Sequence, residues 1–280
     1  MSNERRRFLL AAGALLAGTV LPAHAIAQLE LAQAGALRVA VYADFAPYSA
    51  RGKGVDIAIA QALAERLGLR AEIVQFAADE DMNDDLRNMV WRGHYLGTRP
   101  ADVMMHVPVD EQFAARNDKV RIIAPYHRET MAIARNPARV PPPAGSAANA
   151  FEVFVREKIG VELDTHASDF LLHVLNGRLR DNVVHFRSVA EATAAMGRGE
   201  ISAVMAPRGQ LEAALKDVAG FELNPLAIPE MRVAAWPLGL AVKAENGELA
   251  KALSVAMAEL QRSGELARIF AEQGVTHLAP

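Results

Sequence analysis

The chain has 280 residues, no cysteine and a net charge of −3 at pH 7. Without cysteine it has neither disulfide bonds nor thiolate metal ligands, so hydrophobic burial must supply its stability. The small negative charge offers nothing that would attract nucleic acid or an anionic membrane surface. No Gly-x-Ser-x-Gly, Walker or His-Glu-x-x-His motif occurs, which removes the commonest signatures of hydrolases, nucleotide-binding enzymes and metalloproteases.

The first 27 residues have the pattern of an export signal. Arg5-Arg6-Arg7 precedes an uncharged apolar run at 11–21, and Ala23-His24-Ala25 offers a small-x-small cleavage site. The apolar run is too short to span a bilayer. The paired arginines before Phe8-Leu9 resemble a twin-arginine signal, and an ordinary secretory signal with an arginine-rich start is the alternative. Both predict a periplasmic protein.

The first half of the mature chain alternates strands with helices. Ile59, Leu63 and Leu67 recur every four residues and form one apolar helical stripe, which Gly68 ends. In chain order we predict a strand at 37–41, a helix at 56–67, a strand at 71–76, a helix at about 84–93 and strands at 101–105 and 122–126. The opening strand, helix and strand form a βαβ unit.

A second alternating set follows an irregular, proline-rich segment at 136–149. Ser188 and Glu191 form a capping box for a helix at 189–197. The other predicted elements are strands at 158–162, 183–186, 201–205, 232–236 and 238–242, helices at 169–175 and 208–218, and a helical end with Leu249, Leu253, Met257 and Leu260 on one face.

Two alternating α/β units joined by two chain crossings predict two lobes with a cleft between them. We place the first lobe at 36–127 plus 232–280 and the second at 128–231. Ligands of open α/β sheets bind outside the carboxyl ends of the strands. The loops that follow strands are therefore where a binding site is expected.

Gly54-Val55-Asp56-Ile57-Ala58-Ile59, followed by Leu63 and Leu67, resembles the signature of family 3 extracellular solute-binding proteins. Val55 and Ala58 depart from the aromatic and acidic residues common at those positions. Further landmarks of the family follow its order, at 37–39, 101–103, 124–126, 159–161 and 199–204. The resemblance implies a two-lobed type II periplasmic binding fold, each lobe a mixed sheet flanked by helices. It also implies a monomer without cofactor or catalysis that binds a small polar ligand and serves the membrane permease of an ABC transporter.

The same resemblance argues against a standard amino acid as the ligand. Amino-acid binders of the family usually hold the α-carboxylate with an arginine, because its guanidinium matches a carboxylate. A gapless count puts Ala114 at that position, and Arg116 replaces it only if the loop is remodelled. The count also puts His106 and Val107 where two hydroxyl residues are common.

Eight residues are candidates for ligand contact. Asp44, Phe45 and Tyr48 follow the first strand, although both aromatic rings are equally well explained by packing in their loop. Thr165, His166 and Ser168 stand at a helix start that suits an anion, and Ser168 alone also suits an ordinary cap. His106 and Arg116 complete the set.

The acidic stretch at 79–85 contains Asp-x-Asp-x-Asn, the opening of a calcium loop. Asp84 stands where the loop needs glycine, and Val90 where it needs glutamate. Acidic residues before a helix are better explained by its dipole, so we predict no metal site. Trp91 and Tyr95, four residues apart, are predicted to share a helical face and to belong to the core, unless exposure marks them as a partner surface.

Two further functions stay open. The segment at 81–97, with 101–108 after it, resembles a subgroup of the family associated with periplasmic quinoprotein alcohol or methanol dehydrogenases as accessory proteins. This implies a dehydrogenase as the partner. A few relatives of the fold dehydrate cyclic acids, and an enzyme of that kind would have only Asp44, His106 and His166 as candidate catalytic groups.

Overall fold

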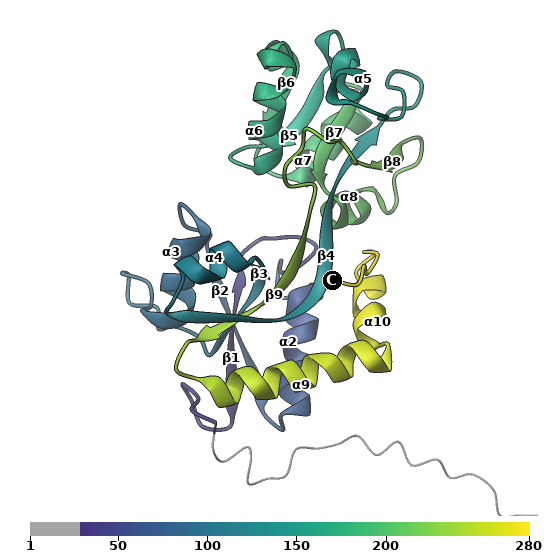
Figure 1. Ribbon diagram of the computed structural model, residues 1–280. Coiled ribbons are helices and arrows are strands. Elements are labelled where there is room, and N and C mark those ends of the chain that lie inside the picture. Colours follow the sequence, from purple (N-terminus) through teal and green to yellow (C-terminus); the bar gives the residue numbers. More distant parts are fainter. Residues whose placement is uncertain (1–28) are drawn as a thin grey trace, which may run out of the picture.

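Two lobes joined by long strands make up the computed structural model, which describes residues 29–280 (Figure 1). The predicted signal peptide at 1–27 lies outside the described residues. In the described part, eight strands follow one another in the order β2-β1-β3-β9-β4-β7-β5-β6, and β8 pairs with β4 off this path. The predicted two-lobed α/β fold is confirmed.

The lower lobe in Figure 1 is built on a mixed sheet. Its strands β1 (Ala36–Tyr42), β2 (Arg70–Phe76) and β3 (Val103–Pro108) are parallel, and β9 (Ala235–Lys243) runs antiparallel to β3. Its helices are α2 (Val55–Arg66), α3 (Met82–Leu86), the π-helical turn η1 (Arg87–Trp91), α4 (Glu111–Arg116), α9 (Gly247–Ser263) and α10 (Glu265–Glu272).

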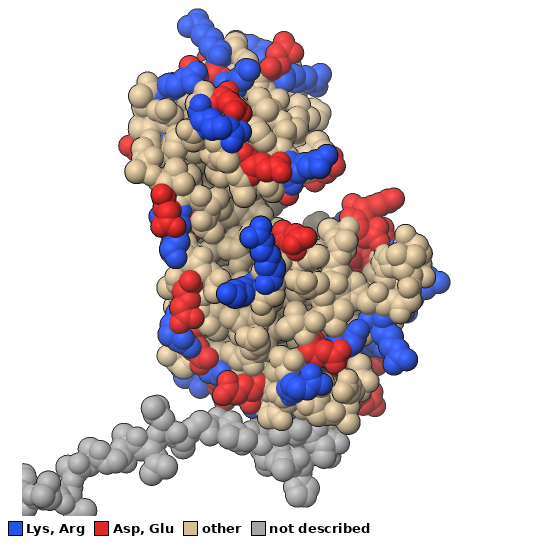
Figure 2. All heavy atoms as spheres, turned by 180° about the vertical axis from the view of Figure 1, so that it is seen from behind, with Lys and Arg blue, Asp and Glu red and all other residues tan. Residues whose placement is uncertain are grey.

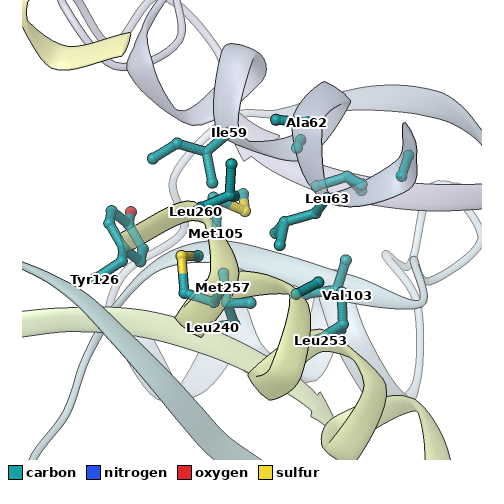
Figure 3. Close-up of a cluster of buried hydrophobic side chains, with 14 of the residues drawn as sticks. Ile59, Ala62, Leu63, Val103, Met105, Tyr126, Leu240, Leu253, Met257 and Leu260 are labelled. Atoms are coloured by element: carbon teal, nitrogen blue, oxygen red, sulfur yellow. The ribbon is translucent and has the colours of Figure 1, made fainter. Parts of the chain in front are cut away.

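The main core of this lobe lies between the sheet and helices α2, α9 and α10. Figure 3 shows side chains of α2, β3, β9 and α9 meeting there, with Tyr126 at the edge. Leu253, Met257 and Leu260 of the predicted apolar face are all buried. Each such side chain stabilises the fold by about 1.5–3 kcal/mol.

The upper lobe repeats the α/β pattern on a smaller scale. β5 (Ile159–Glu162) pairs in parallel with β6 (Val183–Phe186) and β7 (Ala203–Pro207). Its other elements are β8 (Glu222–Pro225), α5 (Ala147–Phe151), α6 (His166–His173), α7 (Val189–Gly197), α8 (Arg208–Leu215) and the 3-10 turns η2 (Glu152–Val155), η3 (Val174–Gly177) and η4 (Arg180–Asn182).

A single strand, β4 (Val120–Arg135), runs through both lobes. It pairs with β9 from Val120 to Thr130 and with β7 and β8 beyond that point. The strand predicted at 122–126 is therefore part of a much longer strand, and those predicted at 232–236 and 238–242 are replaced by the single strand β9. The β4–β9 ladder has a bulge between Ile123 and His127, where Ala124 has a φ of 51°. The bulge bends the crossing strand without ending it.

The helix predicted at 84–93 begins and ends two residues earlier than expected and is less regular. It divides into α3 and η1 and ends at Trp91, beyond which the chain turns at Gly93 with a φ of 94°. Trp91 packs against the second core of the lower lobe, whereas Tyr95 is 83% exposed. The prediction that these two rings share a helical face was wrong. Throughout residues 29–280, no helix has the length and apolar character needed to cross a membrane.

Candidate ligand-binding cleft

The strand directions bring the carboxyl ends of both sheets to face each other. β4 leaves the lower lobe and enters the upper one, and β5 and β7 run back in the opposite direction. β1 and β3 run in the same sense as β4, since β9 is antiparallel to both β3 and β4. Figure 2 shows a wide hollow between the lobes. The loops after β1, β3, β5 and β7 therefore point toward the space between the lobes, where the fold favours ligands.

The loop after β1 carries three of the predicted site residues in different surroundings. Asp44 is exposed and has a φ of 51°. Phe45 is half-buried, and its ring stacks on that of Tyr48 at a centroid distance of 5.3 Å. Tyr48 is fully buried. In this conformation Asp44 and Phe45 are open to a ligand, whereas Tyr48 is a core residue of the lower lobe.

His106 joins these rings from the end of β3. It lies in a bulge of the β3–β9 ladder and has a φ of 63°. Its ring lies 4.9 Å from that of Phe45 and 4.3 Å from that of Tyr48. A left-handed backbone conformation in a non-glycine residue costs about 1–3 kcal/mol. The bulge places the imidazole against the rings of Phe45 and Tyr48, at the edge of the lower-lobe core.

Asp56, in the first turn of α2, anchors His106. One carboxylate oxygen of Asp56 lies 3.1 Å from Nδ1 of His106, and the other accepts the Tyr126 hydroxyl at 2.8 Å. Asp56 is 1% exposed, and the His106 side chain is 11% exposed. Burial and the Asp56 carboxylate both raise the pKa of Tyr126, so its phenol stays protonated and remains a donor.

A second buried carboxylate lies beside this pair. Glu129 of β4 accepts the hydroxyl of Tyr48 and, at 3.3 Å, the backbone N–H of Gly209 in α8. Burial raises the pKa of Glu129, because a charged carboxylate loses its hydration there. We call Tyr48, Asp56, His106, Tyr126 and Glu129 the hinge cluster. It links the floor of the cleft to the crossing strand and to a helix of the upper lobe.

Sequence reasoning found His106 and Tyr48 but missed the rest of the hinge cluster. Asp56 was noted only as part of a signature and as a helix-start residue. Tyr126 and Glu129 lie within β4, so neither follows a strand toward the cleft. The one available signal was an acidic residue, Asp56, in line with the apolar stripe of the helix predicted at 56–67.

The upper lobe brings Thr165, His166 and Ser168 together at the start of α6. The Thr165 hydroxyl accepts the Ser168 backbone N–H at 3.2 Å and donates to the Glu162 carbonyl at 2.8 Å. Ser168 is buried, and its hydroxyl lies 2.9 Å from Nε2 of His185. His166 is exposed. Thr165 and Ser168 thus have partners inside the lobe, and the His166 side chain is free to meet a ligand.

Arg116 stands apart from both groups. It is an exposed residue at the end of α4. Among the described residues it forms no ion pair or hydrogen bond with the hinge cluster or with the start of α6. Ligand contact for the eight predicted residues stays a prediction.

The acidic stretch before α3 is occupied by internal contacts. Asp81 caps the helix through the backbone N–H groups of Asn83 and Asp84. Asp85 is buried and accepts the Tyr42 hydroxyl at 2.6 Å, and Asp79 accepts the Asn88 side chain. Over residues 29–280, no three acidic or histidine side chains are grouped closely enough to hold a metal ion.

A C-terminal strap (Thr276–Pro280) covers the back of the hinge. The Arg128 backbone N–H donates to the Leu278 carbonyl at 2.9 Å, and the Leu278 N–H donates to Nδ1 of His127 at 3.3 Å. The Thr276 N–H donates to Glu212 of α8 at 2.6 Å. Burial, and to a smaller extent the neighbouring His277, lowers the pKa of His127 to about 4. The strap therefore connects the lower lobe to β4 and α8, and its contact with β4 includes His127, which the lowered pKa keeps neutral near pH 7.

Comparison with known proteins returned solved structures only. Neither protein-family profiles nor curated sequences match the chain. An ancestral cationic amino acid solute-binding protein is 21% identical, with a TM-score of 0.65 over 86% of this chain and 96% of its own. The GluR0 ligand-binding core in complex with L-glutamate is 20% identical, with a TM-score of 0.61 over 85% and 98%.

The chain has the fold of these solute-binding proteins. An L-arginine-bound ABC transporter substrate-binding protein from Streptococcus pneumoniae adds a TM-score of 0.61 at 18% identity, over 87% of this chain and 96% of its own. A second structure of the same ancestral protein, described there as a precursor of cyclohexadienyl dehydratase, has a TM-score of 0.60 at 21% identity, over 86% of this chain and 96% of its own. Such likeness fixes the architecture and leaves the ligand open.

Proposed function

We propose that the protein is a periplasmic, family 3 solute-binding protein that closes its lobes around a small polar ligand for an ABC transporter. The observation that carries the proposal is the hollow between two lobes whose sheets present their strand ends to each other. β4 and β9 are the two strands that pair along the crossing between the lobes. Such a connection suits hinge closure, which buries a ligand between rigid bodies.

The lining supports a ligand other than a standard amino acid. Arg116 is exposed on α4 and, among the described residues, forms no hydrogen bond or ion pair with the hinge cluster or the start of α6. Ala114 is half-buried in the same helix. The floor of the cleft offers instead the half-buried ring of Phe45 and an imidazole held by Asp56. An aromatic face with few polar groups suits a small ligand that presents both apolar surface and a hydrogen-bonding group.

Thermal denaturation of residues 28–280 against a library of amino acids, organic acids, alcohols, amines and metal ions tests this function. One chemical class should raise the unfolding midpoint, because a ligand that binds only the folded state stabilises it by mass action. His166→Ala should weaken that ligand about tenfold or less. The matched control is His173→Ala, which alters an exposed histidine of the same helix. If no compound in the library raises the unfolding midpoint, the proposed solute-binding function is wrong.

The second candidate function is docking to a periplasmic quinoprotein alcohol or methanol dehydrogenase. Tyr95 and Leu96 favour it, because they are 83% and 76% exposed at the tip of one loop. Aromatic side chains are enriched in protein interfaces. Immobilised residues 28–280 should retain a purified quinoprotein dehydrogenase, and a Tyr95→Ser/Leu96→Ser variant should not. Equal retention by both proteins would remove this loop from the interface.

A further inference from the structure

The buried Asp56 carboxylate determines how the His106 ring carries its proton. One Asp56 oxygen accepts the Tyr126 hydroxyl at 2.8 Å, and the other lies 3.1 Å from Nδ1 of His106. Asp56 also lies in the first turn of α2, where the positive end of the helix dipole favours a carboxylate. An ionised carboxylate only accepts hydrogen bonds. Nδ1 of His106 must therefore carry the hydrogen that occupies this contact.

The other ring nitrogen is left for a partner outside the protein. In a neutral imidazole with hydrogen on Nδ1, Nε2 is an acceptor. Within residues 29–280 no hydrogen bond reaches Nε2, and 11% of the His106 side chain is exposed. The rings of Phe45 and Tyr48 lie against the imidazole and restrict its rotation. The acceptor nitrogen is thus fixed in place at the end of β3, next to the cleft.

The charges around His106 favour a donor as its partner. The groups that face it are the carboxylates of Asp56 and Glu129 and the phenols of Tyr48 and Tyr126. Asp44 is exposed in the loop beside Phe45. None of these three carboxylates is paired with lysine or arginine in the described part of the chain. A ligand group with N–H or O–H hydrogens suits this surface better than an anion does.

We infer that the cleft accepts a ligand hydroxyl or ammonium group through Nε2 of His106, with Asp56 as the positioning residue that sets the histidine tautomer. The inference rests on the proposed solute-binding function, because it names the ligand group that one wall of that site accepts. His106 is then a specificity-determining residue, since a buried acceptor discriminates against ligands that lack a donor.

Nitrogen-15 spectra of histidine-labelled residues 28–280, at about pH 7.5, test the tautomer without any ligand. The His106 signals, assigned by their loss in His106→Gln, should show hydrogen on Nδ1 and none on Nε2. In Asp56→Asn, the Tyr126 hydroxyl keeps its acceptor and the carboxamide N–H faces Nδ1, so the hydrogen should move to Nε2. Hydrogen on Nε2 in the unaltered protein overturns the inference. This result does not depend on whether Asp56→Asn folds.

Matched pairs of small probes test the ligand side. Putrescine and its fully methylated quaternary analogue test an ammonium donor, and glycerol and its trimethyl ether test a hydroxyl donor. The donor-bearing probe should shift the Nε2 signal and bind about tenfold more tightly than its methylated partner, and Asp56→Asn should abolish that preference. A probe that raises the unfolding midpoint without shifting the Nε2 signal of His106 overturns the inference, but it still supports solute binding. If no probe and no library ligand binds, the proposed function fails and takes the inference with it.

Discussion

Replacing Gly209 by alanine is expected to destabilise the protein by about 2 kcal/mol, a typical cost of overpacking a closed site. A Cβ at this position would lie 2.3 Å from the Tyr48 hydroxyl oxygen and 3.2 Å from a Glu129 carboxylate oxygen. Tyr48 is fully buried and hydrogen-bonded to Glu129, so it has little room to move away. The strain should push α8 of the upper lobe away from the hinge. Urea unfolding measures the loss, and small-angle X-ray scattering measures the change in lobe separation.

Gly197→Ala is the matched control, because a Cβ there would meet nothing within 4 Å and the residue, like Gly209, lies in an end turn of an upper-lobe helix. It should leave both measurements almost unchanged. Tyr48→Phe removes the atom that clashes and, alone, leaves Glu129 without one donor. The Gly209→Ala/Tyr48→Phe double variant should therefore lose at least about 1 kcal/mol less than the sum of the two single losses. Strictly additive losses would show that Tyr48 and Gly209 do not meet in solution.

The contact matters for function because it connects the cleft to the opposite lobe. The Tyr48 ring touches His106 on one side, and its hydroxyl reaches Glu129, which also accepts from Gly209. Each step joins residues from different elements through atoms in contact. A ligand that moves His106 is thus positioned to alter the packing of α8 against the crossing strand. The double variant measures the energetic coupling at one step of this series of contacts, between Tyr48 and Gly209.

Hydrophobic periodicity predicted one buried stripe of α2 and the buried face of α9. The four-residue stripe of α2 and the apolar face of α9 appear as buried side chains in one core. The capping box at Ser188 also predicted the start of α7, where its hydroxyl accepts the Glu191 N–H. In each case a local pattern encodes the result, because the helix repeat itself places those residues on one side.

The crossing strand could not be predicted in the same way. The polar run from His127 to Thr130 follows the strand predicted at 122–126 and reads as its end. In the structure these residues continue the ladder with β9, and the polar side chains find partners that are distant in the sequence. Glu129 bonds Tyr48, and His127 bonds Leu278. No local signal reports such pairs, so tertiary contacts override the local pattern.

In the candidate site, too, some positions follow from local sequence patterns and others depend on tertiary contacts. Asp44, Phe45 and His106 follow predicted strands, so their positions at the sheet edge could be predicted from direction alone. The carboxylate that holds His106 comes from a helix fifty residues earlier in the chain. Its role depends on a bulge in β3 and on a left-handed residue, which the spacing of apolar residues does not reveal. The sequence thus predicts which strand ends carry these residues, whereas the contacts that hold His106 in place are visible only in three dimensions.

Acid should destabilise the protein through His127, by about 2.5 kcal/mol between about pH 7 and about pH 4.5. The pKa of His127 is lowered from 6.5 to about 4 on folding. Between these values the unfolded chain binds more protons than the folded chain, so stability falls as the pH falls. Urea unfolding at the two pH values measures the difference. In His127→Asn, whose amide oxygen can accept the Leu278 N–H, this part of the pH dependence should disappear.

Other buried groups titrate in the same range, and the comparison between variants separates them. Glu129 acts in the opposite direction: its raised pKa means that the folded state holds a proton longer, and that stability is lost as the pH rises. Glu129 is unchanged in His127→Asn and cancels in the difference. His173→Asn alters an exposed histidine and should keep the acid sensitivity of the parent protein. A His127→Asn protein as acid-sensitive as its parent would show that His127 is not buried in solution.

A chain that stops after Val275 extends this test to the C-terminal strap. Removing the strap deletes the Leu278 contact with His127 and exposes the back of the hinge to water. The pKa of His127 should then return toward its ordinary value, because burial is the largest cause of its shift. The truncated chain should be less stable than the parent near pH 7, where it lacks the strap's hydrogen bonds, and should lose less stability on acidification. If truncation leaves the acid sensitivity unchanged, β4 and Phe270 bury His127 without the strap, and the strap does not control the protonation of His127.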